Sequence, residues 1–217
     1  DELIERVRAL GPTLRQDAMR ADAQRRLTDT VNESLTNAGL FRLATPKRYG
    51  GYETDFHTIV EITEEVGVED TSAAWLVAIA AAAASIVVRM SIRAQDDIFG
   101  DNPDARIAGA SSPCSAVRVD GGVAMSGRWP YASGAHFAQW AAISGSLRDN
   151  SGNVDVLMGM TPVSDVQMDD TWHVTGMRGT GSISWVGTNV FVPEHRLISL
   201  SRLAENSLPD LADTATG

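Results

Sequence analysis

The chain has 217 residues, 43% of them hydrophobic, which is typical of a globular protein. Its formal net charge of −10 argues against a nucleic-acid partner, because binding to phosphates needs a basic surface. A single cysteine, Cys114, excludes an internal disulfide and is typical of a reducing compartment. No charged-then-apolar leader opens the sequence, so we expect no signal peptide and a cytoplasmic protein.

Helical signals dominate the first 105 residues. Apolar residues recur at helical spacing from Leu3 to Leu14, and Thr28 can cap a second helix that ends at Gly39. Residues 56–66 have an apolar face that predicts a third helix.

The longest apolar run extends from Ala73 to Val88 and is mostly alanine. A membrane span needs about 20 strongly apolar residues, so we expect a buried helix and no membrane partner. Asp70 supplies a capping oxygen for this helix, and Ser91 caps a short one that follows. Trp75 is expected in the core.

The pattern changes near residue 105, after which most of the 19 glycines occur. Residues 116–119 and 123–129 predict two strands joined by the hairpin turn Asp-Gly-Gly. Further strands are expected at 137–147, 154–161, 166–172 and 183–192. The predicted class is α+β: an all-helical domain (1–105), a small antiparallel β-barrel or sandwich domain (106–200) and a linker (201–217).

Several common chemistries have no motif here. The four histidines are far apart and show no metal-ligand spacing, so no metal site is expected. No Gly-x-Ser-x-Gly elbow or Walker loop occurs. The glycine-rich stretch 176–181 lies between predicted strands and opens no helix, which excludes a dinucleotide-binding loop.

The segment 126–136, Ser-Gly-Arg-Trp-Pro-Tyr-Ala-Ser-Gly-Ala-His, is the most informative part of the chain. Trp129 and Tyr131 can wall a planar heterocycle. Ser133 and nearby backbone N–H groups can hydrogen-bond to its edge. The segment therefore predicts a surface that lies against a flat ring.

Four blocks in the same order resemble the acyl-CoA dehydrogenase superfamily: Pro-Lys-Arg-Tyr-Gly-Gly at 46–51, the segment 126–136, Asp-Thr-Trp-His-Val-Thr-Gly-Met-Arg-Gly-Thr-Gly-Ser at 170–182, and Val-Phe-Val-Pro-Glu-His-Arg at 190–196. The wording Gly-Arg-Trp-Pro-Tyr-Ala-Ser-Gly is closest to the hydroxylase components of two-component flavin-dependent monooxygenases. The resemblance covers about residues 28–200.

The resemblance implies reduced FMN or FAD supplied by a separate flavin reductase, and hydroxylation of a small aromatic molecule with O2. It places Trp129 and Tyr131 along the isoalloxazine, with Ser133 near flavin N5, where a hydroxyl can steady a hydroperoxide. Ser111 and Ser112 match a second strand end that contacts flavin. The catalytic base stays unassigned.

The family also has a C-terminal four-helix bundle, which this chain lacks, and forms homo-oligomers, commonly tetramers. Two alternatives stay open. One is an FAD-dependent acyl-CoA dehydrogenase, which would need a catalytic carboxylate in that bundle. The other is a truncated or degenerate relative without turnover, because alanines at 80–84 stand where related monooxygenases often carry a substrate-facing histidine.

Overall fold

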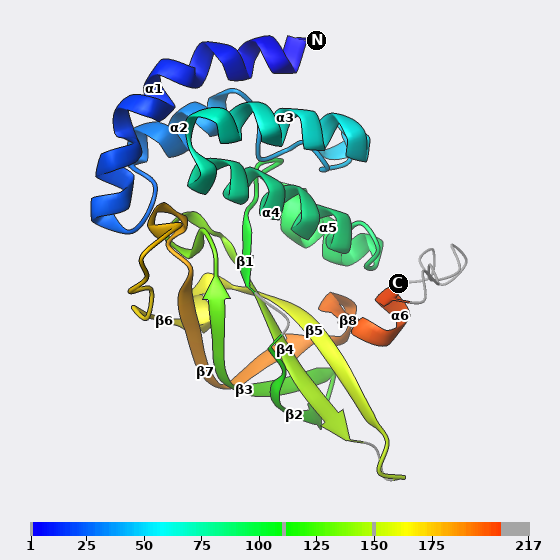
Figure 1. Cartoon of the computed structure of the whole chain (residues 1–217). Coiled ribbons are helices and arrows are strands. Elements are labelled where there is room, and N and C mark those ends of the chain that lie inside the picture. The colour runs from blue at the N-terminus through cyan, green and yellow to red at the C-terminus, as the bar shows by residue number, and fades with distance from the viewer. Residues whose placement is uncertain (1, 110–111, 149–150, 205–217) are drawn as a thin grey trace.

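The computed structural model describes residues 2–109, 112–148 and 151–204. The helices are α1 (Glu2–Gln24), α2 (Asp29–Asn37), α3 (Phe56–Glu69), α4 (Thr71–Val87), α5 (Ile92–Phe99) and α6 (Leu200–Ala204). The strands are β1 (Ile107–Gly109), β2 (Cys114–Val119), β3 (Gly122–Ala132), β4 (Trp140–Arg148), β5 (Val154–Pro162), β6 (Gln167–Asp169), β7 (Ile183–Pro193) and β8 (Leu197–Ser199). The predicted α+β order of helices followed by a mainly antiparallel sheet is confirmed, and no four-helix bundle occurs in the described ranges (Figure 1).

Side-chain caps fix the starts of the helices as the sequence predicts. The Thr28 hydroxyl accepts a hydrogen bond from the backbone of Val31 at the start of α2. Asp70 caps α4, and Ser91 caps α5. Helix α1 is longer than predicted and continues through Pro12 to Gln24, because one face stays buried along its whole length.

All eight strands form one sheet, with the order β6-β7-β3-β2-β4-β5-β8 and β1 beside β4. β1 and β2 run parallel to β4, and the other pairs are antiparallel. β2 and β3 are longer than predicted, and two other strands are shorter. β4 starts only at Trp140 because the short helix Ala135–Phe137 precedes it, and β6 ends at Asp169 because residues 170–182 leave the sheet.

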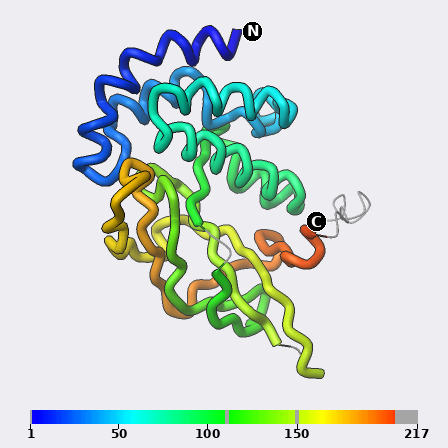
Figure 2. The backbone as a smooth tube through the Cα atoms, viewed as in Figure 1, coloured from blue at the N-terminus to red at the C-terminus, as the bar shows by residue number. Residues whose placement is uncertain are grey.

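Helices α1–α5 form a layer that covers one end of the twisted sheet, and β1 lies between the two parts (Figures 1 and 2). A core inside the helical layer is formed by α1–α4, and a second core fills the sheet around Trp129 and Trp185. A third joins α4 and α5 to the sheet through Val87, Ile107 and Met160. The two parts are therefore packed together through apolar side chains.

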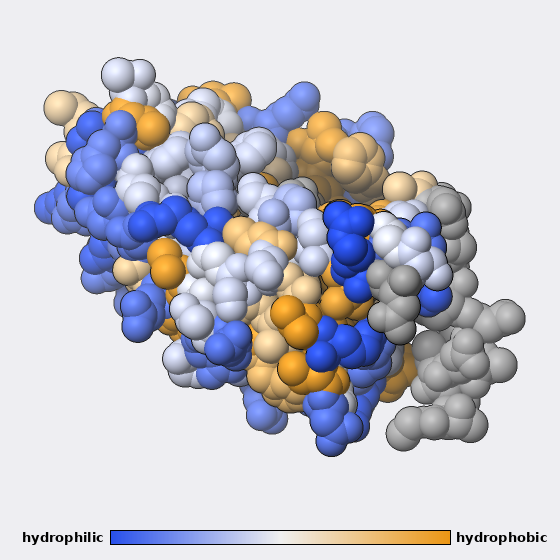
Figure 3. All heavy atoms as spheres, turned by 90° about the horizontal axis from the view of Figure 1, so that it is seen from below, coloured by the Kyte–Doolittle hydropathy of each residue, from blue (hydrophilic) through white to orange (hydrophobic). Residues whose placement is uncertain are grey.

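Two exposed apolar regions stand out. One is a groove of about 560 Å³ between α3 and α4, where Phe56 is 80% exposed. The other is a row across the sheet in which Val117 pairs with Ala124, and Ala124 pairs with Phe191. Figure 3 shows apolar side chains gathered among charged ones on the lower face of the molecule. None of the helices in the described residues has the length and apolar character needed to cross a membrane.

Candidate functional site

A bulge in β3 separates its two aromatic side chains. The register of β3 with β7 shifts once between Met125 and Gly127, and Trp129 then lies opposite Trp185. It shifts again by one residue before Ala132 pairs with Ile183. Pro130 has no N–H for the ladder, and Tyr131 adopts a left-handed conformation with φ of 65°. Residues two apart in a strand normally share a face. Here Trp129 is 0% exposed and Tyr131 is 63% exposed, because the bulge turns Tyr131 outward.

Trp129 lies in the core of the sheet. Its Nε1 donates to the backbone oxygen of Ser144 at 2.7 Å, and Trp185 beside it donates to Ala108 at 2.8 Å. Both indoles therefore have hydrogen-bond partners in an apolar environment. A flat ligand could contact Trp129 only by displacing side chains of this core. The predicted contact between Trp129 and a flat ligand therefore stays a prediction.

Tyr131 instead meets Trp172, which the sequence analysis had placed at the end of a strand. The two rings are edge to face, with centroids 6.3 Å apart. Trp172 lies in the irregular segment that follows β6, and its Nε1 donates to the backbone oxygen of Met177. The exposed aromatic surface at this site is thus built from two segments that are 41 positions apart in sequence.

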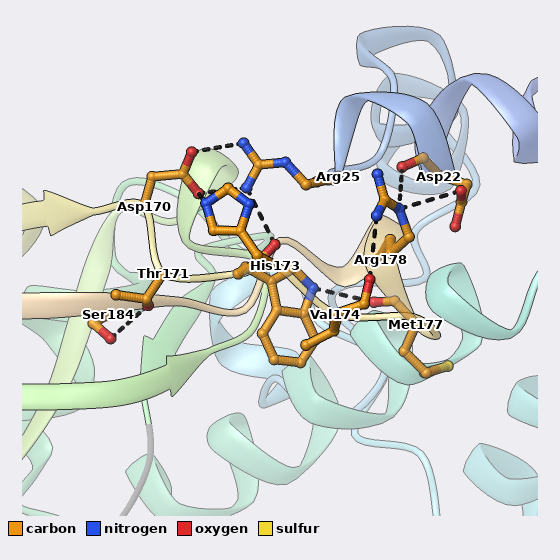
Figure 4. A network of polar contacts seen from close by, with 10 residues as sticks. Asp22, Arg25, Asp170, Thr171, His173, Val174, Met177, Arg178 and Ser184 are labelled. Atoms are coloured by element: carbon orange, nitrogen blue, oxygen red, sulfur yellow. Dashed lines mark hydrogen bonds and ion pairs between the residues drawn. The ribbon is translucent and has the colours of Figure 1, made fainter.

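Two arginines tie the segment carrying Trp172 to the end of α1 (Figure 4). Arg25 makes two hydrogen bonds of 2.6 Å to the carboxylate of Asp170 and one of 3.1 Å to the backbone oxygen of Trp172. Arg178 donates to the backbone oxygen of Asp22 at 3.0 Å. The Arg25 guanidinium lowers the pKa of Asp170 from its usual value.

Ser133 belongs to a chain of hydrogen bonds that crosses from α4 to the segment before β7. Trp75 Nε1 lies 3.1 Å from Ser133 Oγ, which lies 2.8 Å from Ser182 Oγ. Ser182 Oγ lies 2.7 Å from Thr180 Oγ1, which donates to the backbone oxygen of Met177 at 2.8 Å. The three hydroxyls are buried.

The two ends of this chain fix the direction of its protons. An indole N–H can only donate, and a carbonyl oxygen can only accept. Thr180 uses its single proton on Met177, so Ser182 must donate to Thr180, and Ser133 must donate to Ser182. The Ser133 oxygen, which already accepts from Trp75, is left with acceptor capacity only. Any further group that approaches it must therefore be a donor.

Comparison with known proteins agrees with this architecture. Residues 2–97 match the family described as "Acyl-CoA dehydrogenase, N-terminal domain". The crystal structure of 3-HSA hydroxylase from Rhodococcus sp. RHA1 has a TM-score of 0.91 and 32% identity, over 99% of this chain and 57% of that one. The chain belongs to the acyl-CoA dehydrogenase superfamily.

Within this superfamily, the chain is similar to oxygenase components. It is 34% identical to the flavin-dependent monooxygenase oxygenase subunit HsaA of Rhodococcus jostii (strain RHA1), over 96% of this chain and 55% of the relative. XiaF from Streptomyces sp., solved in complex with FADH2 and glycerol, has a TM-score of 0.87 and 35% identity, over 91% of this chain and 50% of that one. The chain spans about half the length of the curated relatives it matches.

The structure brings only some of the predicted site residues together. Tyr131 and Ser133 flank one turn, in which the Ser133 N–H donates to the Tyr131 oxygen at 2.9 Å. Ser112 lies two residues before β2, and its backbone oxygen lies 3.7 Å from Cys114 Sγ. Ser111 lies outside the described residues.

Sequence reasoning missed the roles of Trp75, Trp172 and Ser182. The expectation that Trp75 is a core residue was wrong, because its side chain is 47% exposed and only its indole N–H is tied to Ser133. The signal for Ser182 was present in the block Gly-Thr-Gly-Ser of this superfamily. Among the described residues, no group of three or more His, Cys, Asp or Glu side chains could hold a metal ion.

Proposed function

We propose that this protein is the oxygenase component of a two-component flavin-dependent monooxygenase. It would take reduced FAD or FMN from a separate flavin reductase and use O2 to hydroxylate a small aromatic molecule. The observation that carries the proposal is the bulge of β3. It places the exposed ring of Tyr131 beside the buried hydroxyl of Ser133, which can only accept a further hydrogen bond. The similarity to HsaA and to the FADH2 complex of XiaF supports it.

The residues at the site fit a flavin. The exposed ring of Tyr131 and the partly buried ring of Trp172 offer an aromatic surface for a flat ring system. Ser133 offers an acceptor, and reduced flavin carries a donor N–H at N5, whereas oxidised flavin carries an acceptor there. We therefore propose that Tyr131 and Trp172 line the ring, and that Ser133 accepts from N5. Trp129, Ser111 and Ser112 remain candidate contacts.

The bound flavin would supply the two electrons that let O2 deliver one oxygen atom to the substrate and the other to water. The chain's own residues hold the ring, keep Ser133 as a hydrogen-bond acceptor and exclude water from the site. The apolar surfaces of α4 and of the sheet core restrict the access of water to Ser133, whose exposed fraction is 8%.

The proposal extends to the organisation of the protein. We propose a helical domain (1–105), a β domain (106–200) and a linker (201–217) that leads to a C-terminal helical domain in the full-length protein. The assembly would be a cytoplasmic homo-oligomer, a tetramer as in the family. The mass of the full-length protein in solution, measured by light scattering, tests this organisation.

The test of function uses the protein at the full length its gene encodes. Stopped-flow mixing with reduced FAD and reduced FMN measures binding, and phenols are then supplied with 18O2. We expect tighter binding of the reduced than of the oxidised flavin, and one 18O atom in the hydroxylated product. Reduction of bound FAD by an acyl-CoA without O2 would instead identify a dehydrogenase. Failure to bind either flavin would favour the alternative that the protein is a degenerate relative without turnover.

A further inference from the structure

Arg106 is a partly buried cation that makes no ion pair with the described residues. It directly precedes β1, and its Nη1 donates to the amide oxygen of Asn32 on α2. Its guanidinium carbon lies 4.7 Å from the centre of the Phe41 ring and 5.9 Å from that of Phe137. The Nε atom is buried and has no hydrogen-bond partner among the described residues.

The nearest acidic side chain does not neutralise this charge. Asp104 is held by Arg42 through contacts of 2.9 and 2.7 Å. No carboxylate of the described residues makes an ion pair with Arg106. Burial lowers the pKa of Arg106, and the charge of Asp104 raises it less. An arginine nevertheless stays charged, so this site holds a desolvated cation with an unused donor, which is unfavourable until an anion binds.

Arg106 borders a cavity that reaches the candidate flavin site. Asn32 and Arg106 line this cavity together with Ser133 and Gly134. Most of the other lining residues are apolar and come from α4, the two phenylalanines and β1. The cavity has about 20 Å³ of room for the centre of a water-sized group. That is enough for about one oxygen atom and too little for an aromatic ring.

We propose that Arg106 and Asn32 form a subsite that binds one ionised oxygen of the substrate, carried by a carboxylate or a phenolate. The guanidinium of Arg106 and the amide nitrogen of Asn32 are the donors, and the aromatic ring lies outside the cavity on the Ser133 side. The assignment of this oxygen to the substrate rests on the proposed function. The subsite itself rests on the uncompensated cation and the cavity. It predicts that the protein selects anionic aromatic molecules over neutral ones of the same shape.

The experiment measures the binding of small aromatic probes to the full-length protein by calorimetry, without flavin and with reduced flavin. Benzoate and neutral benzamide form one pair. 4-Nitrophenol forms the second arm, because its ionisation near neutral pH is visible by absorbance. We expect benzoate to bind at least about tenfold more tightly than benzamide, because a hydrogen bond to a charged group contributes that much. A bound phenolate lowers the apparent pKa of 4-nitrophenol; a carboxylate-specific subsite leaves it unchanged.

Arg106→Gln should abolish the preference for benzoate, and Arg106→Lys should restore part of it by returning the charge. The matched control is Arg26→Gln. Arg26 also stacks on the Phe137 ring, at 5.4 Å, but pairs with Asp29 and does not line the cavity. This variant should keep the preference. Thermal unfolding of each variant confirms that it is folded. If Arg106→Gln does not fold, the test compares the preference for benzoate in Arg106→Lys with that in the natural protein.

The outcomes separate the subsite from the proposed function. Equal affinities for benzoate and benzamide in the natural protein would overturn the subsite. So would a preference that survives in Arg106→Gln or stays undiminished in Arg106→Lys. Binding of reduced flavin by that same protein would still leave the oxygenase proposal intact. An Arg106-dependent preference for benzoate in a protein that binds no flavin would uphold the subsite as an anion site and reject the oxygenase.

Discussion

Trp129 and Tyr131 are two residues apart in one strand, yet they serve different parts of the molecule. Trp129 belongs to the buried half of β3, where its indole lies in the core of the sheet and its N–H donates to Ser144 of β4. Tyr131 belongs to the bulged half, where a residue with positive φ turns an aromatic ring outward beside Ser133. The comparison shows that one extra residue in a strand can convert a packing position into a binding position. The buried half should control stability, and the bulged half should control ligand binding.

The largest expected effect is on stability, through the buried half of β3. Trp129→Ala should lower the free energy of unfolding by about 3–5 kcal/mol, because it removes a large side chain from a closed core. Tyr131→Ala should change it by about 0.5 kcal/mol or less, because its side chain is exposed. Urea denaturation followed by circular dichroism measures both. Equal losses for the two variants would show that the bulge does not divide the strand in this way.

A smaller effect is expected from the hydroxyl of the bulged half. Ser133→Ala should weaken the binding of reduced flavin about five- to tenfold, as the loss of one hydrogen bond does, and should leave oxidised flavin nearly unaffected. Fluorescence titration under anaerobic conditions measures both constants. Ser34→Ala is the control, because that hydroxyl bonds only to its own helix, at Thr30. Unchanged affinity for reduced flavin would argue against the proposed role of Ser133.

Ser182→Ala should also lower the selectivity for reduced flavin, but through the oxidised form. Without Ser182 as its acceptor, Ser133 regains a free proton and can donate to oxidised flavin. The ratio of the affinities for reduced and oxidised flavin should therefore fall by a few-fold, mainly through tighter binding of oxidised flavin. The same anaerobic titration measures the ratio. A ratio equal to that of the natural protein would mean that the direction of the hydrogen-bond chain does not set the selectivity.

The smallest effect concerns the ion pair that holds the segment of Trp172. The pKa of Asp170 is lowered in the folded state, so the ion pair stabilises the protein above the unfolded pKa of about 4. This contribution is lost as the pH falls through the folded pKa. Asp170→Asn should slightly lower the thermal midpoint at pH 7, and the difference should vanish in acid. The effect is small because the pair is largely exposed to solvent.

Hydrogen exchange of residues 170–177 distinguishes this ion pair from any other on the surface. Exchange in this segment should become faster in Asp170→Asn. It should not change in Asp29→Asn, which breaks an arginine pair with Arg26 away from the segment. Equal exchange in both variants would mean that Arg25 does not hold the segment in place.

The sequence predicted the helices and most strands because their periodicity and caps are local signals, as at Thr28 and Asp70. It predicted the importance of segment 126–136. It did not predict that Trp129 would be buried in the core while Tyr131 would be exposed at the site. Strand alternation would put Trp129 and Tyr131 on one face, and only the register with β7 shows the bulge. The partners of Ser133 and the cavity at Arg106 depend on contacts between distant segments, which no local pattern contains.

The bond between Arg25 and Asp170 has a consequence for the order in which the protein assembles. Its two residues are 145 positions apart, so Arg25 leaves the ribosome long before its partner is synthesised. The helical part can begin to fold during translation, whereas the surface formed by Tyr131 and Trp172 can be completed only after β6 and the residues following it have emerged. A nascent chain arrested before residue 170 should thus contain folded helices and no finished binding surface.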